Sequence, residues 1–185
     1  MSPVIDKYAR PTKLLWVDLE MTGLDPEKDV ILEIAAEITD FNFTTLASYQ
    51  SLVKQPKEVV EDRMQKNSWW SEYPENRDTF IANLGAAKPS EEVASDMVHL
   101  ITEQFGGESA ILAGNSIHND RNFIRYWWPE FEAKLHYRML DVSSFKVLVQ
   151  GKYDDIFQKQ EVHRALDDIQ ASIEELRYYL KHVNY

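Results

Sequence analysis

The stretch LLWVDLEMTG, Leu14–Gly23, carries the strongest signal for the fold of this chain. It is an apolar run rich in strand formers, and the turn residues that begin at Thr22 end it. Only Asp18 and Glu20 interrupt the run. Because they are two positions apart, both side chains leave the same face of a strand, with Cα atoms roughly 6.5–7 Å apart. Carboxylates on an apolar strand are unfavourable unless they are paired or bind a cation, so the stretch predicts a central strand that carries two metal ligands.

Two more acidic motifs lie far along the chain. Asp120 closes GNSIHND at the expected start of a helix, and Asp168 closes HRALDD in the first turn of the last helix. Oxygen ligands suit Mg²⁺ or Mn²⁺, and the chain has no cysteine to favour zinc. His163, five residues before Asp168, has an ordinary pKa of about 6.5, which suits a general base. Two cations can activate a water and stabilise the leaving oxygen, so the pattern predicts metal-dependent phosphodiester hydrolysis.

Each of these residues also has a simpler explanation when it is taken alone. Acidic residues such as Asp167 and Asp168 at a helix start are favoured by the helix dipole, and a lone histidine before a helix is usually solvated. The occurrence of all these residues in one chain favours a functional site. Surface and capping roles account least well for the Asp-x-Glu pair, because it lies inside an apolar strand.

The composition sets limits on the class of protein. A chain of 185 residues with 44% hydrophobic residues predicts one folded domain, residues 1–185, with a flexible amino-terminal segment at 1–11. The chain has neither a secretory h-region nor an apolar run of membrane-spanning length, so we expect a cytoplasmic protein without membrane contact. The net charge is −11 and no stretch is rich in Lys or Arg. An enzyme that tracks long nucleic acid usually has a basic stripe, so any nucleic-acid substrate should be very short.

Hydrophobic periodicity predicts an α/β architecture. Strands are expected at residues 14–21, 30–39, 46–53, 110–113 and 137–140, and helices at 58–70, 76–87, from 89 onward, 119–127, 142–149 and 165–181. Three strands followed by strands that alternate with helices predict a mixed central sheet flanked by helices.

The linked motifs resemble the DEDD exonuclease superfamily in its histidine-bearing branch, and more closely the oligoribonuclease family. The resemblance is carried by residues 16–24, 113–120, 136–143 and 163–169, and it runs from about Leu14 to Tyr179. It implies a ribonuclease H-like exonuclease fold and a homodimeric 3′→5′ exoribonuclease. The implied substrates are single-stranded RNAs of about two to five nucleotides, especially diribonucleotides, which are degraded to 5′-mononucleotides.

The same resemblance implies roles for individual residues. Two divalent ions, Mg²⁺ or Mn²⁺, would be held by Asp18, Glu20, Asp120 and Asp168, with His163 as the base. The five-residue spacing from His163 selects Asp168 rather than its neighbour Asp167.

The implied substrate contacts include a cap for the 5′ phosphate, made by Ser116, Arg138 and Ser143, with Ser144 where the family usually has threonine. An arginine fork with hydroxyl groups binds a terminal phosphate bidentately and blocks a further nucleotide, which gives length selectivity without a basic groove. Tyr137 matches an aromatic residue that reaches the partner's site in the dimer, and Leu24 matches an apolar wedge between bases. The alternatives are a surface ion pair for Arg138 and a core position for Tyr137.

Two segments depart from the family pattern. In residues 62–84 the family has a tryptophan that stacks on a base. Here Trp69 is taken as that residue and Trp70 is the alternative. Residues 149–161 replace a family segment that is more basic, so the resemblance assigns no substrate contact there.

Two other functions stay open. One is a DEDD-type exonuclease that acts on longer RNA or DNA in processing or proofreading, and the other is a non-catalytic RNA-binding protein. The acidic composition and the His136–Arg138 motif argue against the first, and the presence of all five catalytic positions argues against the second. The identity of the physiological dinucleotide is also left open.

Overall fold

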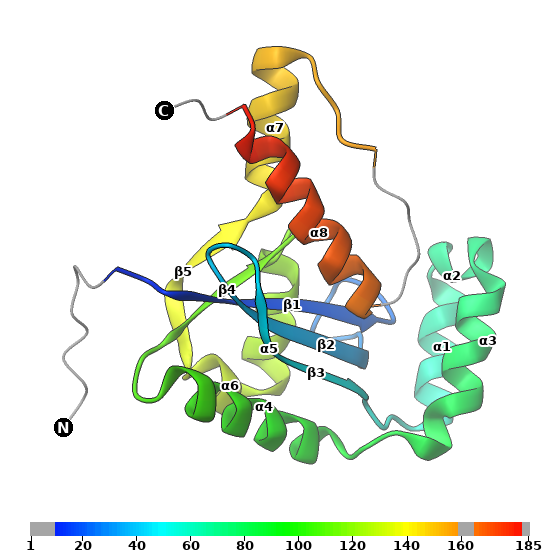
Figure 1. Cartoon of the computed structure of the whole chain (residues 1–185). Helices are drawn as coiled ribbons and strands as arrows, with labels where there is room; N and C mark the ends of the chain where they lie inside the picture. The colour runs from blue at the N-terminus through cyan, green and yellow to red at the C-terminus, as the bar shows by residue number, and fades with distance from the viewer. Residues whose placement is uncertain (1–9, 159–164, 183–185) are drawn as a thin grey trace.

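The computed structural model describes residues 10–158 and 165–182, and Figure 1 shows how their helices and strands are arranged. The strands form a five-stranded sheet in the order β3-β2-β1-β4-β5. They are β1 (Lys13–Met21), β2 (Ile31–Asp40), β3 (Thr45–Leu52), β4 (Ala110–Gly114) and β5 (Leu135–Asp141). The first three strands are antiparallel, while β4 runs parallel to β1 and β5 runs parallel to β4. The predicted mixed sheet flanked by helices is confirmed.

The helices cover both faces and one end of this sheet (Figure 1). They are α1 (Lys57–Lys66), α2 (Trp69–Glu72), α3 (Pro74–Asn83), the 3₁₀ turn η1 (Leu84–Ala86), α4 (Ser90–Phe105), α5 (His118–Trp127), α6 (Pro129–Glu132), α7 (Val142–Tyr153) and α8 (Ala165–Leu180). Among the described residues, no helix is long and apolar enough to span a membrane.

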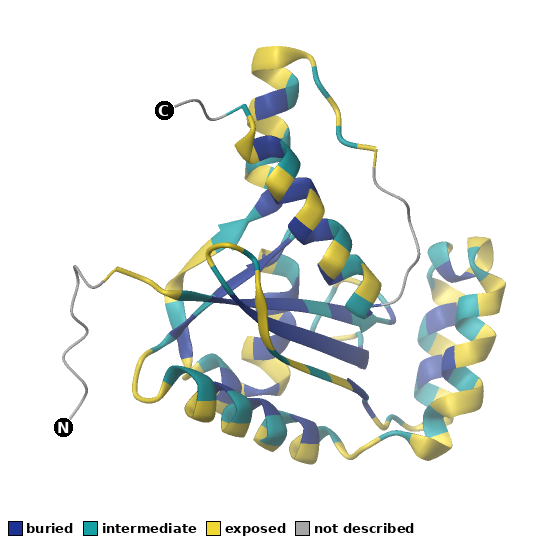
Figure 2. Ribbon diagram, in the orientation of Figure 1, coloured by how far each residue is buried: buried dark blue, intermediate teal, exposed yellow. Residues whose placement is uncertain are grey.

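The alternation of side chains along β1 divides the core into two layers. Leu15, Val17 and Leu19 pack into the cluster that also contains residues of α4 and α5. Leu14 and Trp16 pack into the opposite cluster, which includes residues of α7 and α8. Asp18 and Glu20 continue the second set, so they lie on the face of the sheet that α8 covers. Figure 2 shows that the central strands between these layers are buried.

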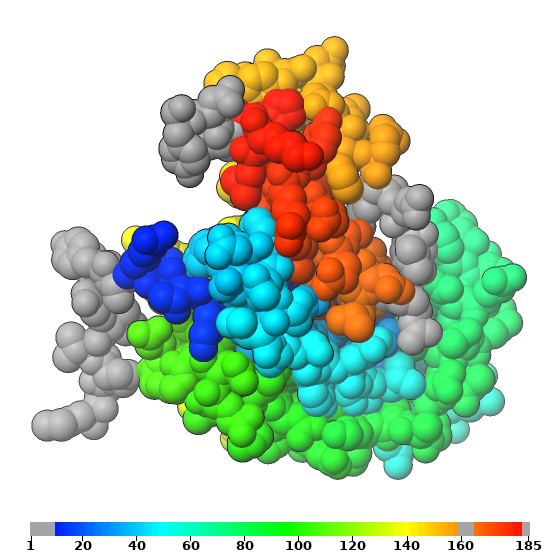
Figure 3. All heavy atoms as spheres, in the orientation of Figure 1, coloured from blue at the N-terminus to red at the C-terminus, as the bar shows by residue number. Residues whose placement is uncertain are grey.

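Helix α8 is held against this face by apolar and polar contacts. Its inner residues, such as Ile169 and Ile173, are only 2% exposed. In the space-filling view α8, coloured orange to red, lies against the β2–β3 hairpin in cyan (Figure 3), and Arg177 donates a hydrogen bond of 3.3 Å to the backbone oxygen of Phe43. This packing brings the first turn of α8 to the carboxylates of β1.

One predicted helix is interrupted. The sequence pattern predicts a continuous helix over 58–70, but α1 ends at Lys66 and α2 begins at Trp69. Asn67 has extended backbone angles, φ −110° and ψ 115°. Its Nδ2 donates to the backbone oxygen of Thr22 at 3.0 Å, and its Oδ1 accepts from the backbone N–H of Trp69 at 3.1 Å. The prediction of one helix was wrong because these hydrogen bonds stabilise extended backbone at Asn67, which interrupts the helix.

Candidate active site

Three carboxylates from two distant segments meet where β1 passes under the first turn of α8. Asp18, Glu20 and Asp168 each offer one carboxylate oxygen, and these three oxygens lie within 4.8 Å of one another. All three residues are half-buried. A cation between negative charges this close relieves their repulsion, and three oxygen ligands suit a hard divalent cation. The residues present therefore fit the predicted metal site.

Asp120, the fourth predicted ligand, is not one of the three described residues whose oxygens lie within 4.8 Å of one another. It is in the first turn of α5 and is 7% exposed. Its Oδ1 accepts a hydrogen bond of 2.9 Å from the backbone N–H of Leu19, the residue between Asp18 and Glu20. Burial raises the pKa of Asp120 to about 7, against the lowering effect of the Leu19 hydrogen bond, and the charge of Asp141 adds a smaller upward push. Asp120 is thus a buried carboxyl beside the strand that carries two of the clustered acids.

The predicted base, His163, lies outside the described residues.

Two serines of the predicted phosphate cap lie side by side. The Oγ atoms of Ser116 and Ser143 are 3.1 Å apart. The backbone N–H of Ser116 donates to Asp141 Oδ1 and to Ser143 Oγ, both at 3.0 Å. Ser116 has a positive φ of 48°, which is uncommon for a residue other than glycine and is held here by these hydrogen bonds. Ser144 is exposed in the first turn of α7, next to Ser143.

Tyr137 and Arg138 are both exposed on β5, which is an edge strand of the sheet. The Arg138 guanidinium carbon lies 5.2 Å from the centroid of the Tyr137 ring, a cation–π arrangement. Tyr137 is 65% exposed, so the alternative of a core position for this residue was wrong.

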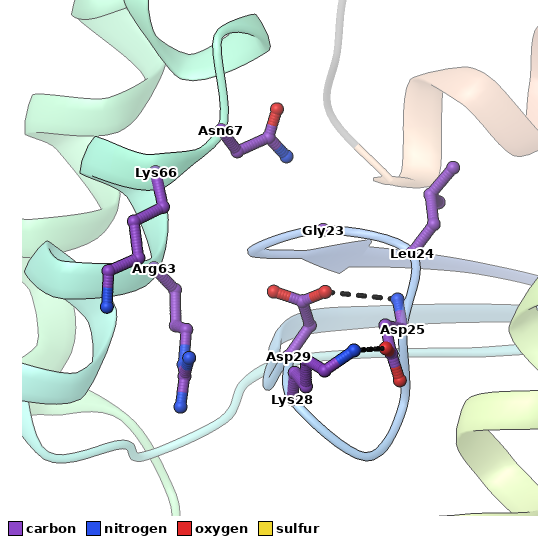
Figure 4. A pocket seen from close by; sticks show the side chains of 8 residues that line it. All are labelled: Gly23, Leu24, Asp25, Lys28, Asp29, Arg63, Lys66 and Asn67. Atoms are coloured by element: carbon purple, nitrogen blue, oxygen red, sulfur yellow. Dashed lines mark hydrogen bonds and ion pairs between the residues drawn. The ribbon is translucent and has the colours of Figure 1, made fainter.

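Leu24 is 71% exposed and lines a pocket of about 510 Å³ between the β1–β2 loop and α1 (Figure 4). The other lining residues are Gly23, Asp25, Lys28, Asp29, Arg63, Lys66 and Asn67. The loop wall is rigid because Asp29 accepts hydrogen bonds from the Thr22 hydroxyl and the Asp25 backbone, each at 3.0 Å. A Cβ on Gly23 would lie 2.5 Å from an oxygen of Asp29, so a larger residue at this position would have to displace the Asp29 carboxylate from these hydrogen bonds.

Neither tryptophan considered for base stacking lines this pocket. Trp70 is 1% exposed, and its indole N–H donates to the Thr22 backbone oxygen at 3.0 Å, so it is a core residue. Trp69 is half-buried and packs against Trp70 and Tyr73, with ring centroids 4.6 and 4.5 Å away. The sequence motifs did not predict the wall of the pocket, which Arg63, Lys66 and Asn67 form. The helical spacing of Arg63 and Lys66 was the available signal, since residues three apart share one face of a helix.

Known proteins resemble this chain over most of its length. Residues 15–176 match the model of the RNase_T exonuclease family. The oligoribonuclease of Thiobacillus denitrificans is 39% identical over 176 residues, which cover 93% of this chain and 95% of that protein. The chain belongs to the oligoribonuclease family. The human mitochondrial oligoribonuclease is 36% identical over 176 residues, which cover 92% of this chain and 73% of that protein.

Solved structures agree on the fold of this oligoribonuclease-family chain. Exonuclease I from Methylocaldum szegediense superimposes with a TM-score of 0.61 at 15% identity, over 90% of this chain. The exonuclease I of E. coli in complex with an oligonucleotide gives a TM-score of 0.59 at 14% identity, over 92% of this chain. The chain spans about two fifths of these exonuclease I chains. The family resemblance and the exonuclease fold predicted from the motifs are confirmed.

Proposed function

We propose that this protein is a metal-dependent 3′→5′ exoribonuclease that hydrolyses very short oligoribonucleotides, especially diribonucleotides, to 5′-mononucleotides. The observation that carries the proposal is the meeting of Asp18, Glu20 and Asp168 within 4.8 Å, in a chain that matches oligoribonucleases over nearly its whole length.

In this proposal Asp18, Glu20 and Asp168, with Asp120 as a fourth carboxylate, hold two divalent cations, Mg²⁺ or Mn²⁺. When bound, such ions lower the pKa of a coordinated water and neutralise charge on phosphate oxygens. The protein supplies a rigid strand for two of the ligands and a packed helix for the third. His163, as the base, takes the proton from the attacking water.

The substrate is oriented at both ends in the proposed complex. Ser116, Ser143, Ser144 and Arg138 bind the 5′ phosphate, because hydroxyl groups and an arginine fork match its oxygens. Leu24 separates the bases, and the pocket beside it receives the 3′ nucleotide. Arg63 and Lys66, which both pair with Asp62, place positive charge on the α1 side of this pocket. Asp25 and Asp29 line its other side. Trp69 stays a predicted stacking residue.

We further propose a homodimer in which Tyr137 reaches the partner's site. The edge strand β5 exposes Tyr137 and Met139, which are 65% and 37% exposed. On α5, Tyr126 and Trp127 are 52% and 37% exposed, and Arg121 of that helix donates to the backbone oxygen of Tyr137 at 3.3 Å. Exposed aromatic side chains on neighbouring elements are typical of protein–protein contacts. A cytoplasmic location stays a prediction.

The test is hydrolysis of a 5′-phosphorylated diribonucleotide and of a longer single-stranded RNA, each with Mg²⁺, with Mn²⁺ and with a chelator. Rapid, chelator-sensitive cleavage of the dinucleotide and slow attack on the longer strand are expected. Preference for the longer strand would assign a processing or proofreading role instead, and binding of either RNA without turnover would assign a non-catalytic one.

A further inference from the structure

A chain of hydrogen bonds connects α8, which carries Asp168, to the loop that carries Ser116. Within α8 the Ser172 hydroxyl donates to the backbone oxygen of Asp168 at 2.8 Å. The side chain of Asn115 then joins this helix to the loop after β4. Its Nδ2 donates to Ser172 Oγ at 3.0 Å and to Glu175 Oε2 at 2.8 Å.

The other end of the Asn115 amide reaches the phosphate cap. Its Oδ1 accepts a hydrogen bond of 3.2 Å from the Ser143 hydroxyl, and Ser143 Oγ in turn accepts from the backbone N–H of Ser116 at 3.0 Å. Both amide hydrogens point to α8 and the amide oxygen points to the cap. The polarity of the amide is therefore defined, and a flipped amide would lose these bonds.

The centre of the connection is buried. Glu175 is 2% exposed and Ser172 is 3% exposed. The second carboxylate oxygen of Glu175 accepts a hydrogen bond of 2.7 Å from the Tyr179 hydroxyl. A buried carboxylate that is held by neutral donors is expensive, and an apolar side chain of similar size would fill the same volume at less energetic cost. Its presence here favours a role in fixing geometry rather than in packing alone.

We propose that Glu175 and Asn115 are positioning residues that hold the phosphate cap at a fixed separation from the metal-binding carboxylates. They thereby select RNA by its length. This inference rests on the proposed function. One nucleoside joins the 5′ phosphate to the scissile phosphate of a dinucleotide and confines their separation to a narrow range. Both phosphates are therefore bound correctly only when the cap and the carboxylates keep a matching separation. A longer RNA cannot place its 5′ phosphate in the cap and therefore gains nothing from this rigidity.

The test compares Glu175→Gln with Glu174→Gln in the full chain. Glu174 is the adjacent residue, is exposed, and pairs with Arg177 at 3.4 Å; the same substitution there is the matched control. The substrates are a 5′-phosphorylated diribonucleotide, the same dinucleotide with a 5′ hydroxyl, and a 5′-phosphorylated RNA of about seven nucleotides. Values of kcat and KM with Mg²⁺ are measured below the unfolding temperature of each variant.

We expect Glu175→Gln to raise KM for the 5′-phosphorylated dinucleotide about tenfold. The preference of this variant for the dinucleotide with a 5′ phosphate over the one with a 5′ hydroxyl should fall as well. The values of kcat/KM for the longer RNA should stay within about twofold, and Glu174→Gln should leave all substrates unchanged. Asn115→Ala should reproduce the loss of selectivity, and it answers the same question if Glu175→Gln does not fold.

Equal losses on all three substrates, or a lower unfolding temperature with unchanged selectivity, would overturn the inference. The proposed function fails in a different way, because the wild-type protein would then show no chelator-sensitive cleavage of the dinucleotide.

Discussion

The backbone N–H of Leu19 donates a hydrogen bond of 2.9 Å to Oδ1 of Asp120, and this bond joins the strand of Asp18 and Glu20 to the first turn of α5. It holds a carboxyl group that burial shifts to a pKa of about 7. Because the folded state favours the protonated form of this group, its ionisation at neutral pH opposes folding until a cation compensates the charge.

Asp120→Asn should therefore stabilise the protein in the presence of a chelator. In the wild type, the Asp120 carboxyl favours the folded state most at a pH below 3.8, its pKa in the unfolded chain. This contribution to stability is lost as the pH rises from 3.8 to about 7, its pKa in the folded protein. The asparagine can still accept the Leu19 hydrogen bond but does not ionise. We expect its free energy of unfolding to exceed that of the wild type at pH 8 by on the order of 2–4 kcal/mol, and by less at pH 5. Urea unfolding at both pH values measures this, and a variant with the same pH dependence as the wild type would contradict it.

Asp168→Asn should abolish both catalysis and stabilisation by Mg²⁺. A ligand that binds only the folded state raises the unfolding temperature, and Asp168 is one of three carboxylates that approach within 4.8 Å. The matched control is Asp167→Asn, because Asp167 is the exposed neighbour in the same turn of α8. Calorimetric scans with and without Mg²⁺, together with dinucleotide hydrolysis, distinguish the two. Persistent stabilisation by Mg²⁺ in Asp168→Asn would remove this residue from the metal site.

Arg138→Ala should reduce cleavage of a 5′-phosphorylated dinucleotide more than cleavage of a longer RNA. A charge-assisted bidentate contact contributes about 1.5–3 kcal/mol, or roughly 10–150-fold in kcat/KM. Arg77→Ala on α3 is the control for loss of one positive charge. If both substrates lose activity equally, Arg138 does not bind the terminal phosphate.

Met139→Lys should shift the protein from dimer to monomer. The substitution places a charge on the edge strand β5, where Met139 is 37% exposed, and charges at the centre of an interface oppose association. Sedimentation velocity of wild type and variant measures the change. A wild type that sediments as a monomer would exclude the proposed homodimer, and a variant that remains dimeric would move the contact away from β5.

Trp69 and Trp70 should respond differently to substitution. Trp70→Ala removes a side chain that is 1% exposed and packs edge-on to Phe80 at 5.8 Å, so it should lower the free energy of unfolding by about 3–5 kcal/mol. Trp69→Ala should weaken dinucleotide binding by about 1–3 kcal/mol if its ring stacks on a base. Chemical unfolding measures the effect of Trp70→Ala. Dinucleotide binding measures the effect of Trp69→Ala, with the substitution made in the Asp168→Asn protein so that the dinucleotide is not cleaved. An unchanged affinity in Trp69→Ala would leave base contacts in this region to the pocket beside Leu24.

Sequence patterns and motifs were enough to predict the mixed sheet, the strand that carries Asp18 and Glu20, the helix that carries Asp168, and the family. The strands and helices follow from hydrophobic periods of two and 3.6 residues, because local backbone geometry sets which side chains share a face. The family follows from short motifs. The tertiary structure alone showed that Asp120 is buried beside Leu19 while the other three acids cluster. It also placed Arg63 across a pocket from Leu24, and Asn115 against Glu175, which is 60 positions away in the chain. Such pairings depend on how helices pack on the sheet, and the free energy of that packing is spread over the whole core rather than over the residues that meet.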